Sequence, residues 1–162
     1  MLPTISVANY FIGKALQEGD NTLTPMKLIK LVYIAHGWHL ANYNNEPLIG
    51  EAVEAWKYGP VIPSLYHEFK QYRNSPITQQ KVIFNEEGEA VILTAPAEYH
   101  PFLDAVWENY KNYSCLDLST ITHQNETPWH KTWVVNKGSQ LSGAIISTES
   151  IAEHYRERVN AS

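Results

Sequence analysis

The chain has 162 residues, of which 44% are hydrophobic and 18% are charged, a composition that predicts one domain with a packed core and excludes a disordered chain. Its net charge of -5 and the lack of a basic run argue against nucleic-acid binding, which needs Lys and Arg to neutralise phosphates. Cys115 is the only cysteine, so an intrachain disulfide is excluded and a reducing, cytoplasmic compartment is expected. The sequence contains neither a signal-peptide pattern nor a stretch apolar enough to span a membrane, so no membrane contact is expected.

Acidic residues are concentrated in the second half of the chain. The residues up to Lys81 include seven Lys or Arg and six Asp or Glu, whereas the remaining residues include five and eleven. Because complementary charge speeds the association of two proteins, this half favours a basic protein partner.

Hydrophobic spacing and capping residues predict the elements of the first half. Thr4 to Glu18 has apolar residues at helical spacing and stops at a glycine. Thr24 and Pro25 supply the cap and the first-turn proline of a second helix, whose apolar residues point almost all round, as in a buried central helix. The next elements are an extended segment over Ala52–Trp56, a turn forced by Gly59–Pro60, a third helix opened by Pro63, and a β-hairpin of Lys81–Phe84 and Glu89–Leu93.

Helical spacing returns in the second half. The expected elements are a helix over Tyr99–Tyr113, helices over Leu116–Gln124 and Pro128–Val135, a loop over Gly138–Gly143, and a last helix over Glu149–Val159 capped by Thr148. The sequence therefore predicts a mainly α fold, a compact helical single domain over residues 1–162 with a small β-hairpin or sheet.

Motifs that would indicate catalysis or a cofactor are sparse. His36 and His39 lie three residues apart on a helix without the His-Glu-x-x-His pattern of zinc hydrolases, so we expect one to be buried and hydrogen-bonded and the other exposed. Cys115 with His123 as its base is an alternative, since such partners need only spatial proximity. The chain contains no phosphate-binding glycine loop and no Gly-x-Ser-x-Gly elbow. We therefore expect no metal, no cofactor and no enzyme.

Aromatic residues cluster around proline and glycine at two places in the chain. Trp56, Tyr58 and Tyr66 surround the Gly59–Pro60 pair, and Trp129 follows a Thr-Pro step. Trp and Tyr near turns are typical of binding hot spots, and the alternative is that they fill the core.

Three separated segments resemble one known family. They are Thr24-Pro25-Met26-Lys27-Leu28-Ile29-Lys30-Leu31-Val32-Tyr33-Ile34-Ala35, then Glu54-Ala55-Trp56-Lys57-Tyr58-Gly59-Pro60-Val61 with Tyr66, and finally Leu118-Ser119 through Thr122-His123 to Pro128-Trp129. In this order they are similar to the Panacea-domain family, the SocA-like antitoxins and GepA-like phage-associated proteins. The resemblance extends from about Val7 to Tyr155.

The resemblance implies a non-enzymatic antitoxin that neutralises a cognate toxin protein by binding it. One branch of the family instead delivers its toxin to a AAA+ protease, so a proteolytic adaptor is the alternative. The residues assigned to toxin binding on this basis are Trp56, Lys57, Tyr58, Tyr66, Thr122, His123 and Trp129. Those assigned to the scaffold are Lys30, Tyr33, Gly59, Pro60 and Pro128. Lys30 interrupts an apolar helix, so its amine must either reach solvent or meet a carboxylate or a carbonyl.

Overall fold

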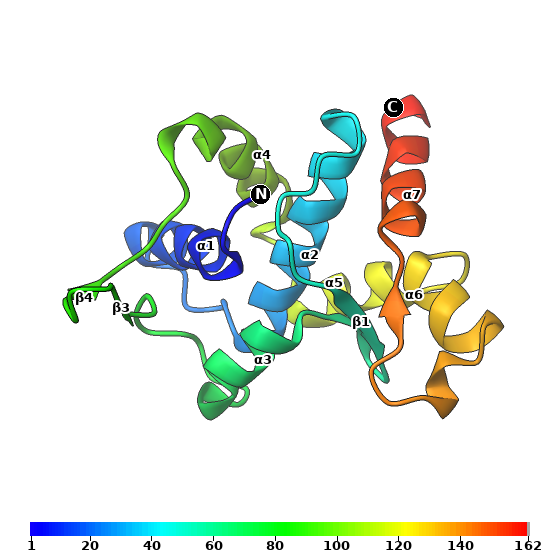
Figure 1. Ribbon diagram of the computed structural model, residues 1–162, viewed down its shortest axis with the longest axis horizontal. Coiled ribbons are helices and arrows are strands. Elements are labelled where there is room, and N and C mark those ends of the chain that lie inside the picture. The colour runs from blue at the N-terminus through cyan, green and yellow to red at the C-terminus, as the bar shows by residue number, and fades with distance from the viewer. Residues whose placement is uncertain (162) are drawn as a thin grey trace.

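The computed structural model describes residues 1–161 and shows a mainly helical chain with two small sheets (Figure 1). The helices are α1 (Thr4–Glu18), α2 (Pro25–Asn42), α3 (Pro63–Phe69), α4 (His100–Tyr110), α5 (Cys115–His123), α6 (Pro128–His130) and α7 (Thr148–Ala161). Shorter turns are η1 (Lys70–Tyr72), η2 (Ala97–Tyr99), the π-helical η3 (Lys131–Val135) and η4 (Gly138–Gln140). The strands are β1 (Val53–Trp56), β2 (Gly59–Val61), β3 (Ile83–Phe84), β4 (Ala90–Val91) and β5 (Ile145–Ile146).

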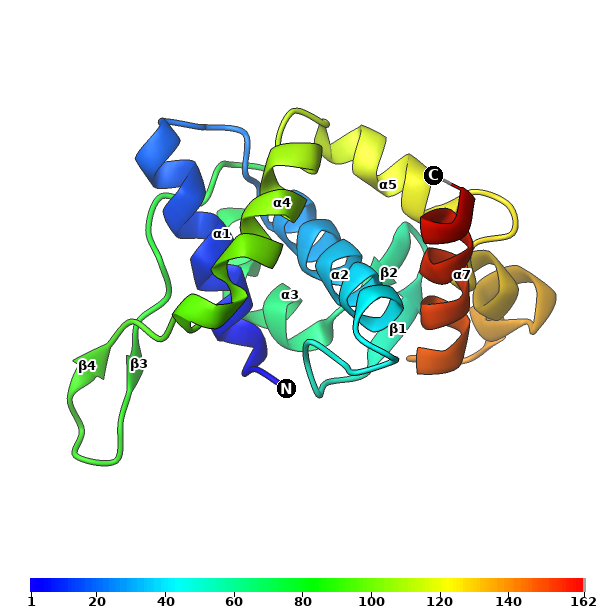
Figure 2. The same ribbon diagram turned by 90° about the horizontal axis from the view of Figure 1, so that it is seen from above.

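Helix α2 is the centre of the fold. It contacts α1, α3, α4, α5 and α7, which surround it in Figures 1 and 2. The Thr24 side chain accepts a hydrogen bond from the backbone N–H of Lys27, and Pro25 occupies the first turn, as the sequence predicts. Burial on all sides explains why its apolar residues follow no single stripe.

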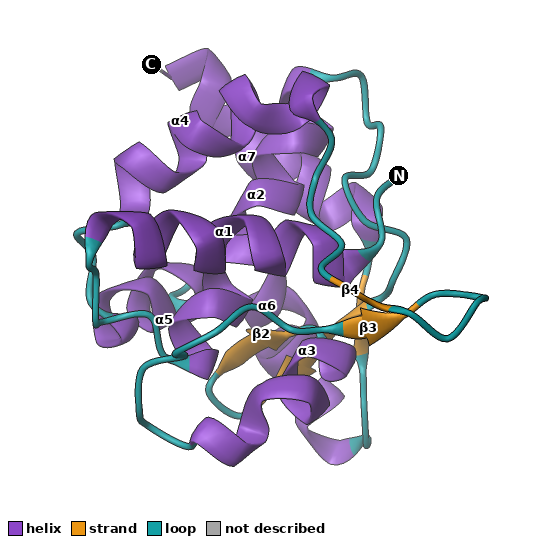
Figure 3. Cartoon of the chain, turned by 90° about the vertical axis from the view of Figure 1, so that its left-hand side faces the viewer, coloured by secondary structure: helices purple, strands orange, loops and turns teal. Residues whose placement is uncertain are grey.

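The two sheets have different positions. Strands β2, β1 and β5 form an antiparallel sheet in that order, in which Trp56 pairs with Gly59 across a turn at Lys57 and Tyr58. Strands β3 and β4 form a separate hairpin that projects from the body of the molecule (Figures 2 and 3). The predicted hairpin is thus confirmed, whereas β2 and β5 were not predicted from the sequence.

The prediction of a turn at Gly59–Pro60 is wrong, because both residues belong to β2. Proline lacks the N–H that a central strand donates, but β2 lies at the edge of its sheet, where this lack costs little. The prediction that Thr148 caps the last helix is also wrong, since Thr148 is the first residue of α7. The Ser147 hydroxyl accepts from the N–H of Ser150 and caps the helix instead.

The histidine pair of α2 also differs from its prediction, because His36 and His39 are both buried. His39 Nδ1 lies 2.7 Å from the Glu46 carbonyl oxygen, whereas His36 Nδ1 has no hydrogen-bond partner among the described residues. Burial, with a smaller contribution from His39, lowers the pKa of His36 to about 4. His36 is therefore a neutral core residue at physiological pH.

Among the described residues, no helix is both long and apolar enough to cross a membrane.

The buried apolar side chains form one cluster, which includes residues of every helix from α1 to α7 and of the strands β1, β2 and β5. The β1–β2 hairpin contributes to this cluster, and its strand β2 packs directly against α2 and α5.

Gly37 of α2 lies at a close contact between two helices. A Cβ atom at this position would lie 2.2 Å from Cε2 of Tyr155 in α7, inside the space that the ring occupies. The Tyr155 ring also packs edge-on against Trp38, at a centroid distance of 5.1 Å. The glycine therefore sets the distance between α2 and α7.

We expect Gly37→Ala to lower the free energy of unfolding by about 1 to 3 kcal/mol, because the added methyl group overlaps the Tyr155 ring. Thermal and denaturant unfolding measure this loss. Gly13→Ala in α1 is the control, since its Cβ would meet only the end of the flexible Gln80 side chain. Equal unfolding free energies for the two variants would contradict the close helix contact.

Candidate functional site

The three segments that resemble one family meet in space around the β1–β2 hairpin. Lys30 of α2, Ser119 of α5 and Trp129 of α6 each donate a hydrogen bond to this hairpin. Segments that are about 30 to 70 residues apart in the sequence thus converge on one turn.

The three donors bind alternate carbonyl oxygens of the hairpin. Trp129 Nε1 donates to Trp56 O at 2.6 Å, and Ser119 Oγ donates to Tyr58 O at 3.0 Å. Lys30 Nζ donates to Pro60 O at 2.8 Å. Because each bond comes from a different helix, the backbone of the hairpin is held by three separate elements.

Gly59 allows the hairpin to approach Lys30. Its φ of +118° is one that residues with a side chain rarely adopt, and a Cβ there would lie 2.9 Å from Lys30 Nζ. The Lys30 side chain is itself fully buried, and its amine donates to Pro60 O. Lys30 thus meets a carbonyl, one of the partners predicted for a lysine in an apolar helix.

Burial has a strong electrostatic effect on Lys30. Loss of solvation lowers the pKa of its amine to about 7, and the nearby Cys115 thiol opposes this shift weakly. A neutral amine still donates a hydrogen bond to Pro60 O, so the contact with the hairpin does not require a buried charge.

The residues proposed for binding divide into exposed and buried groups. Tyr58 is 63% exposed at the turn, with the Lys57 amine 5.4 Å from its ring centroid. Tyr66 is exposed and packs edge-on against the half-buried Trp56, with 5.1 Å between the ring centroids. His123 is half-buried. We call Trp56, Lys57, Tyr58, Tyr66 and His123 the hairpin-tip surface.

Thr122 and Trp129 are both buried, so they do not present side chains for contact. The Thr122 hydroxyl bonds the carbonyls of Leu118 and Ser119 within its own helix. The Trp129 ring supports His123 edge-on, at a centroid distance of 5.3 Å. Thr122 and Trp129 therefore support the hairpin-tip surface from its buried side.

The scaffold residues named from the sequence are all buried. Tyr33 packs edge-on against Tyr155, and Gly59 and Pro60 form β2 against α2. Pro128 opens α6, where the Thr127 hydroxyl caps the helix through the N–H of His130.

Two residues of the site were not assigned to it from the sequence. Ser119 belongs to the third motif segment, but its bond to Tyr58 O depends on the packing of α5 on the hairpin. Glu54 accepts a hydrogen bond from Trp56 Nε1 at 3.0 Å and so orients that ring. A Cβ at Gly143 would lie 2.8 Å from the same carboxylate, so the segment before β5 packs tightly on Glu54.

The alternative of a Cys115–His123 pair is not supported by the geometry. The two residues lie at opposite ends of α5, and eight residues of helix span about 12 Å. His123 Nδ1 instead contacts the carbonyl of Ser119, one turn earlier. No group of three or more metal-ligating side chains occurs within residues 1–161.

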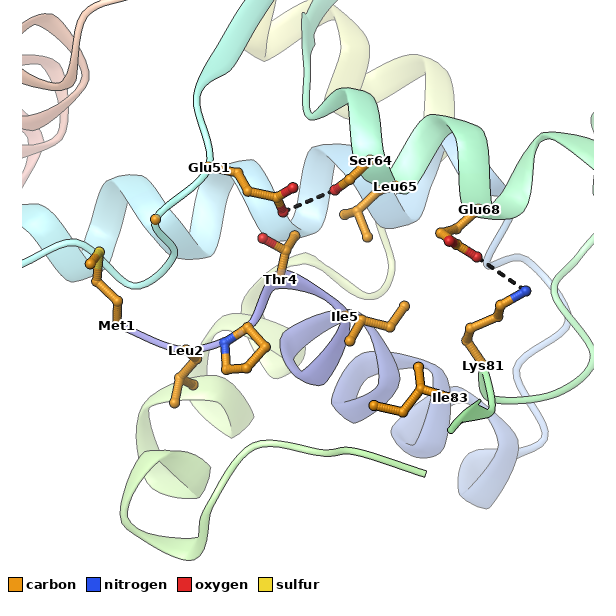
Figure 4. A pocket seen from close by; sticks show the side chains of 12 residues that line it. Met1, Leu2, Thr4, Ile5, Glu51, Ser64, Leu65, Glu68, Lys81 and Ile83 are labelled. Carbon is orange, nitrogen blue, oxygen red and sulfur yellow. Dashed lines mark hydrogen bonds and ion pairs between the residues drawn. The ribbon is translucent and has the colours of Figure 1, made fainter. Parts of the chain in front are cut away.

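A large pocket lies elsewhere in the fold (Figure 4). Its volume is about 590 Å³, and it lies between the N-terminal segment, α3 and the start of β3. Glu51 bonds the Ser64 hydroxyl and Glu68 pairs with Lys81, while the Thr4 hydroxyl is buried without a hydrogen-bond partner in the described part of the chain. No residue of the hairpin-tip surface lines this pocket.

Comparison with known proteins confirms the family that the three segments resemble. Residues 28–130 match the family described as antitoxin SocA-like, Panacea domain. The chain belongs to this family. It is also 31% identical over 133 residues to Antitoxin SocA of Caulobacter vibrioides (strain NA1000 / CB15N), an alignment that covers 76% of this chain. The chain spans 66% of that relative's length, just under two thirds. No solved structure matches the chain.

The lowered pKa of the buried Lys30 amine predicts how the stability of the protein depends on pH. The Lys30 pKa is about 7 in the folded protein and 10.5 when the amine is in water, as in the unfolded chain, so the unfolded chain binds more protons between these values. The stabilising contribution of Lys30 therefore increases as pH rises from about 7 to about 10.5, by at most about 1.4 kcal/mol per pH unit. This contribution is fully lost once pH falls through 7.

Denaturant unfolding of the wild type and Lys30→Met at several pH values measures this effect, because the difference between the two proteins cancels the other titrating groups. We expect the wild type to gain stability relative to Lys30→Met above pH 7. Parallel stability curves would contradict a depressed pKa at Lys30.

Proposed function

We propose that this chain is an antitoxin that acts in the cytoplasm and neutralises a toxin protein by direct binding, with the hairpin-tip surface as its main contact. Family membership supports the antitoxin role. The observation that supports the surface is the fixation of one turn by three hydrogen bonds from three helices, which leaves Tyr58 exposed.

The composition of the hairpin-tip surface suits a protein contact. Two tyrosines, a tryptophan edge and an imidazole offer large contact area with few rotatable bonds, which limits the entropy lost on binding. The turn is held in place before a partner arrives, so little further ordering is required. The chain as a whole carries a charge of -5, which favours a basic toxin.

The partner to test first is the protein encoded by the gene adjacent to that of this chain. We expect it to be toxic when expressed alone, and its purified activity to be blocked by stoichiometric addition of the chain without any protease. Blocking only when a AAA+ protease and ATP are present would support the proteolytic-adaptor alternative. No binding between the two purified proteins would contradict the proposal.

The contact residues are tested by Tyr58→Ala, Tyr66→Ala and His123→Ala, made singly. We expect Tyr58→Ala to keep the wild-type Tm and to weaken binding of the adjacent-gene product by about 2 kcal/mol, or about thirtyfold. Calorimetry of binding and thermal unfolding give the two quantities for each variant.

The control is Tyr43→Ala, since this tyrosine is 46% exposed but lies at the C-terminal end of α2, away from the hairpin. Its binding should remain within about twofold of the wild type. If Tyr58→Ala, Tyr66→Ala and His123→Ala all bind normally, or fail only by unfolding, the hairpin-tip surface is not the contact.

A further inference from the structure

The β3–β4 hairpin, with the residues that flank it, forms an arm over residues 81–93 that extends away from the helices (Figures 2 and 3). A two-stranded hairpin has two open edges and is only marginally stable alone. The structure therefore has to hold the arm in place by contacts at its base and at its turn.

Asn9 fastens the base of the arm. This asparagine of α1 is fully buried, and its side chain donates to Lys81 O at 3.0 Å and to Leu93 O at 2.9 Å. Its Oδ1 accepts from the N–H of Lys81 at 2.7 Å. The first and last residues of the arm are thus bound to one side chain, and the ion pair of Lys81 with Glu68 at 3.1 Å adds a contact to α3.

The turn of the arm is also defined. The Asn85 side-chain oxygen accepts from the N–H groups of Glu87 and Glu89, at 3.1 and 2.9 Å. Gly88 has a φ of +77°, which this turn needs. The arm is therefore ordered at both ends, although it is not packed in the core.

One face of the arm is apolar and exposed. The strand register pairs Phe84 with Ala90, and by the same register Val82 lies opposite Ile92. All four side chains are exposed, and Phe84 is 72% exposed. The opposite face carries Ile83, which lines the pocket of Figure 4. An exposed apolar face of this kind is a candidate for protein contact.

The charge near this face indicates the partner. Residues 82–110 contain six acidic residues and no Lys or Arg. Glu86, Glu87 and Glu89 lie in the turn beside the apolar face, and none of the three forms an ion pair within the described part of the chain. A second copy of this acidic chain would bring like charges together, whereas a basic partner would neutralise them.

We propose that the apolar face of the β3–β4 arm is a second contact for the toxin, and that it binds an apolar groove bordered by Lys or Arg. This inference rests on the proposed antitoxin function. It adds a contact that is separate from the hairpin-tip surface, since the arm and the β1–β2 hairpin belong to different sheets.

The test uses the full chain and the purified adjacent-gene product, with the double variant Phe84→Ser/Ile92→Ser. We expect the variant to keep the wild-type Tm, because neither side chain is in the core, and to bind at least about tenfold more weakly. Leu141→Ser is the control, since Leu141 is 65% exposed and lies between η4 and β5, a strand of the other sheet. Its affinity should stay within about twofold of the wild type.

The charge is tested by Glu86→Gln/Glu87→Gln/Glu89→Gln in the same binding experiment. We expect slower association than the wild type at about 0.05 M salt and equal association at about 0.5 M salt, where charges are screened. If the variant and the wild type associate at the same rate at both salt concentrations, the proposal that the partner is basic is overturned.

The possible outcomes distinguish failure of the arm contact from failure of the proposed antitoxin function. Normal binding by Phe84→Ser/Ile92→Ser, with wild-type binding intact, would overturn the role of the arm alone. Failure of the wild type to bind would overturn the antitoxin function and the arm contact together. A wild-type dimer that the double variant converts to a monomer in sedimentation would show that a second copy covers the face, and would also overturn the proposal.

Discussion

The hydrogen bond from the buried Lys30 amine to the Pro60 carbonyl is the contact on which the arrangement of the site depends. A lysine in the middle of a core is costly unless its nitrogen finds an acceptor, and here the acceptor is the backbone of a strand. The approach is close enough that Gly59 is required beside it. The central helix thus holds the β1–β2 hairpin through its backbone, and the side chains of the turn remain free to point outward.

The molecule presents two ordered features that extend beyond its core, and they are held by the same kind of contact. Lys30, Ser119 and Trp129 bind carbonyls of the β1–β2 hairpin, while Asn9 binds the backbone of the first and last residues of the β3–β4 arm. In each case polar side chains of the helical body fix a short hairpin that buries little surface of its own. Such preorganisation reduces the entropy lost when a partner binds, which suits the proposed binding of a toxin.

The sequence predicted most of the helices because their boundaries are encoded locally, as in the Thr24–Pro25 cap of α2 and the Gly19 stop of α1. It did not predict β2 and β5, which are short and exist through pairing with β1. The motif segments meet around the β1–β2 hairpin, yet the burial of Thr122 and Trp129 depends on how α5 and α6 pack. The role of Asn9 was not visible, since nothing near it in the sequence indicates that residues 81 and 93 meet there.

Backbone hydrogen exchange of the chain, alone and in complex with the purified adjacent-gene product, tests the binding surface most directly. If the β1–β2 hairpin is the main contact, amides in the turn at Lys57–Tyr58 and in the C-terminal part of α5 should exchange more slowly in the complex. The β3–β4 arm should be protected as well, with α7 unchanged. Protection confined to α7 or to the pocket beside the N-terminal segment, with the hairpin turn unaffected, would contradict the proposed surface.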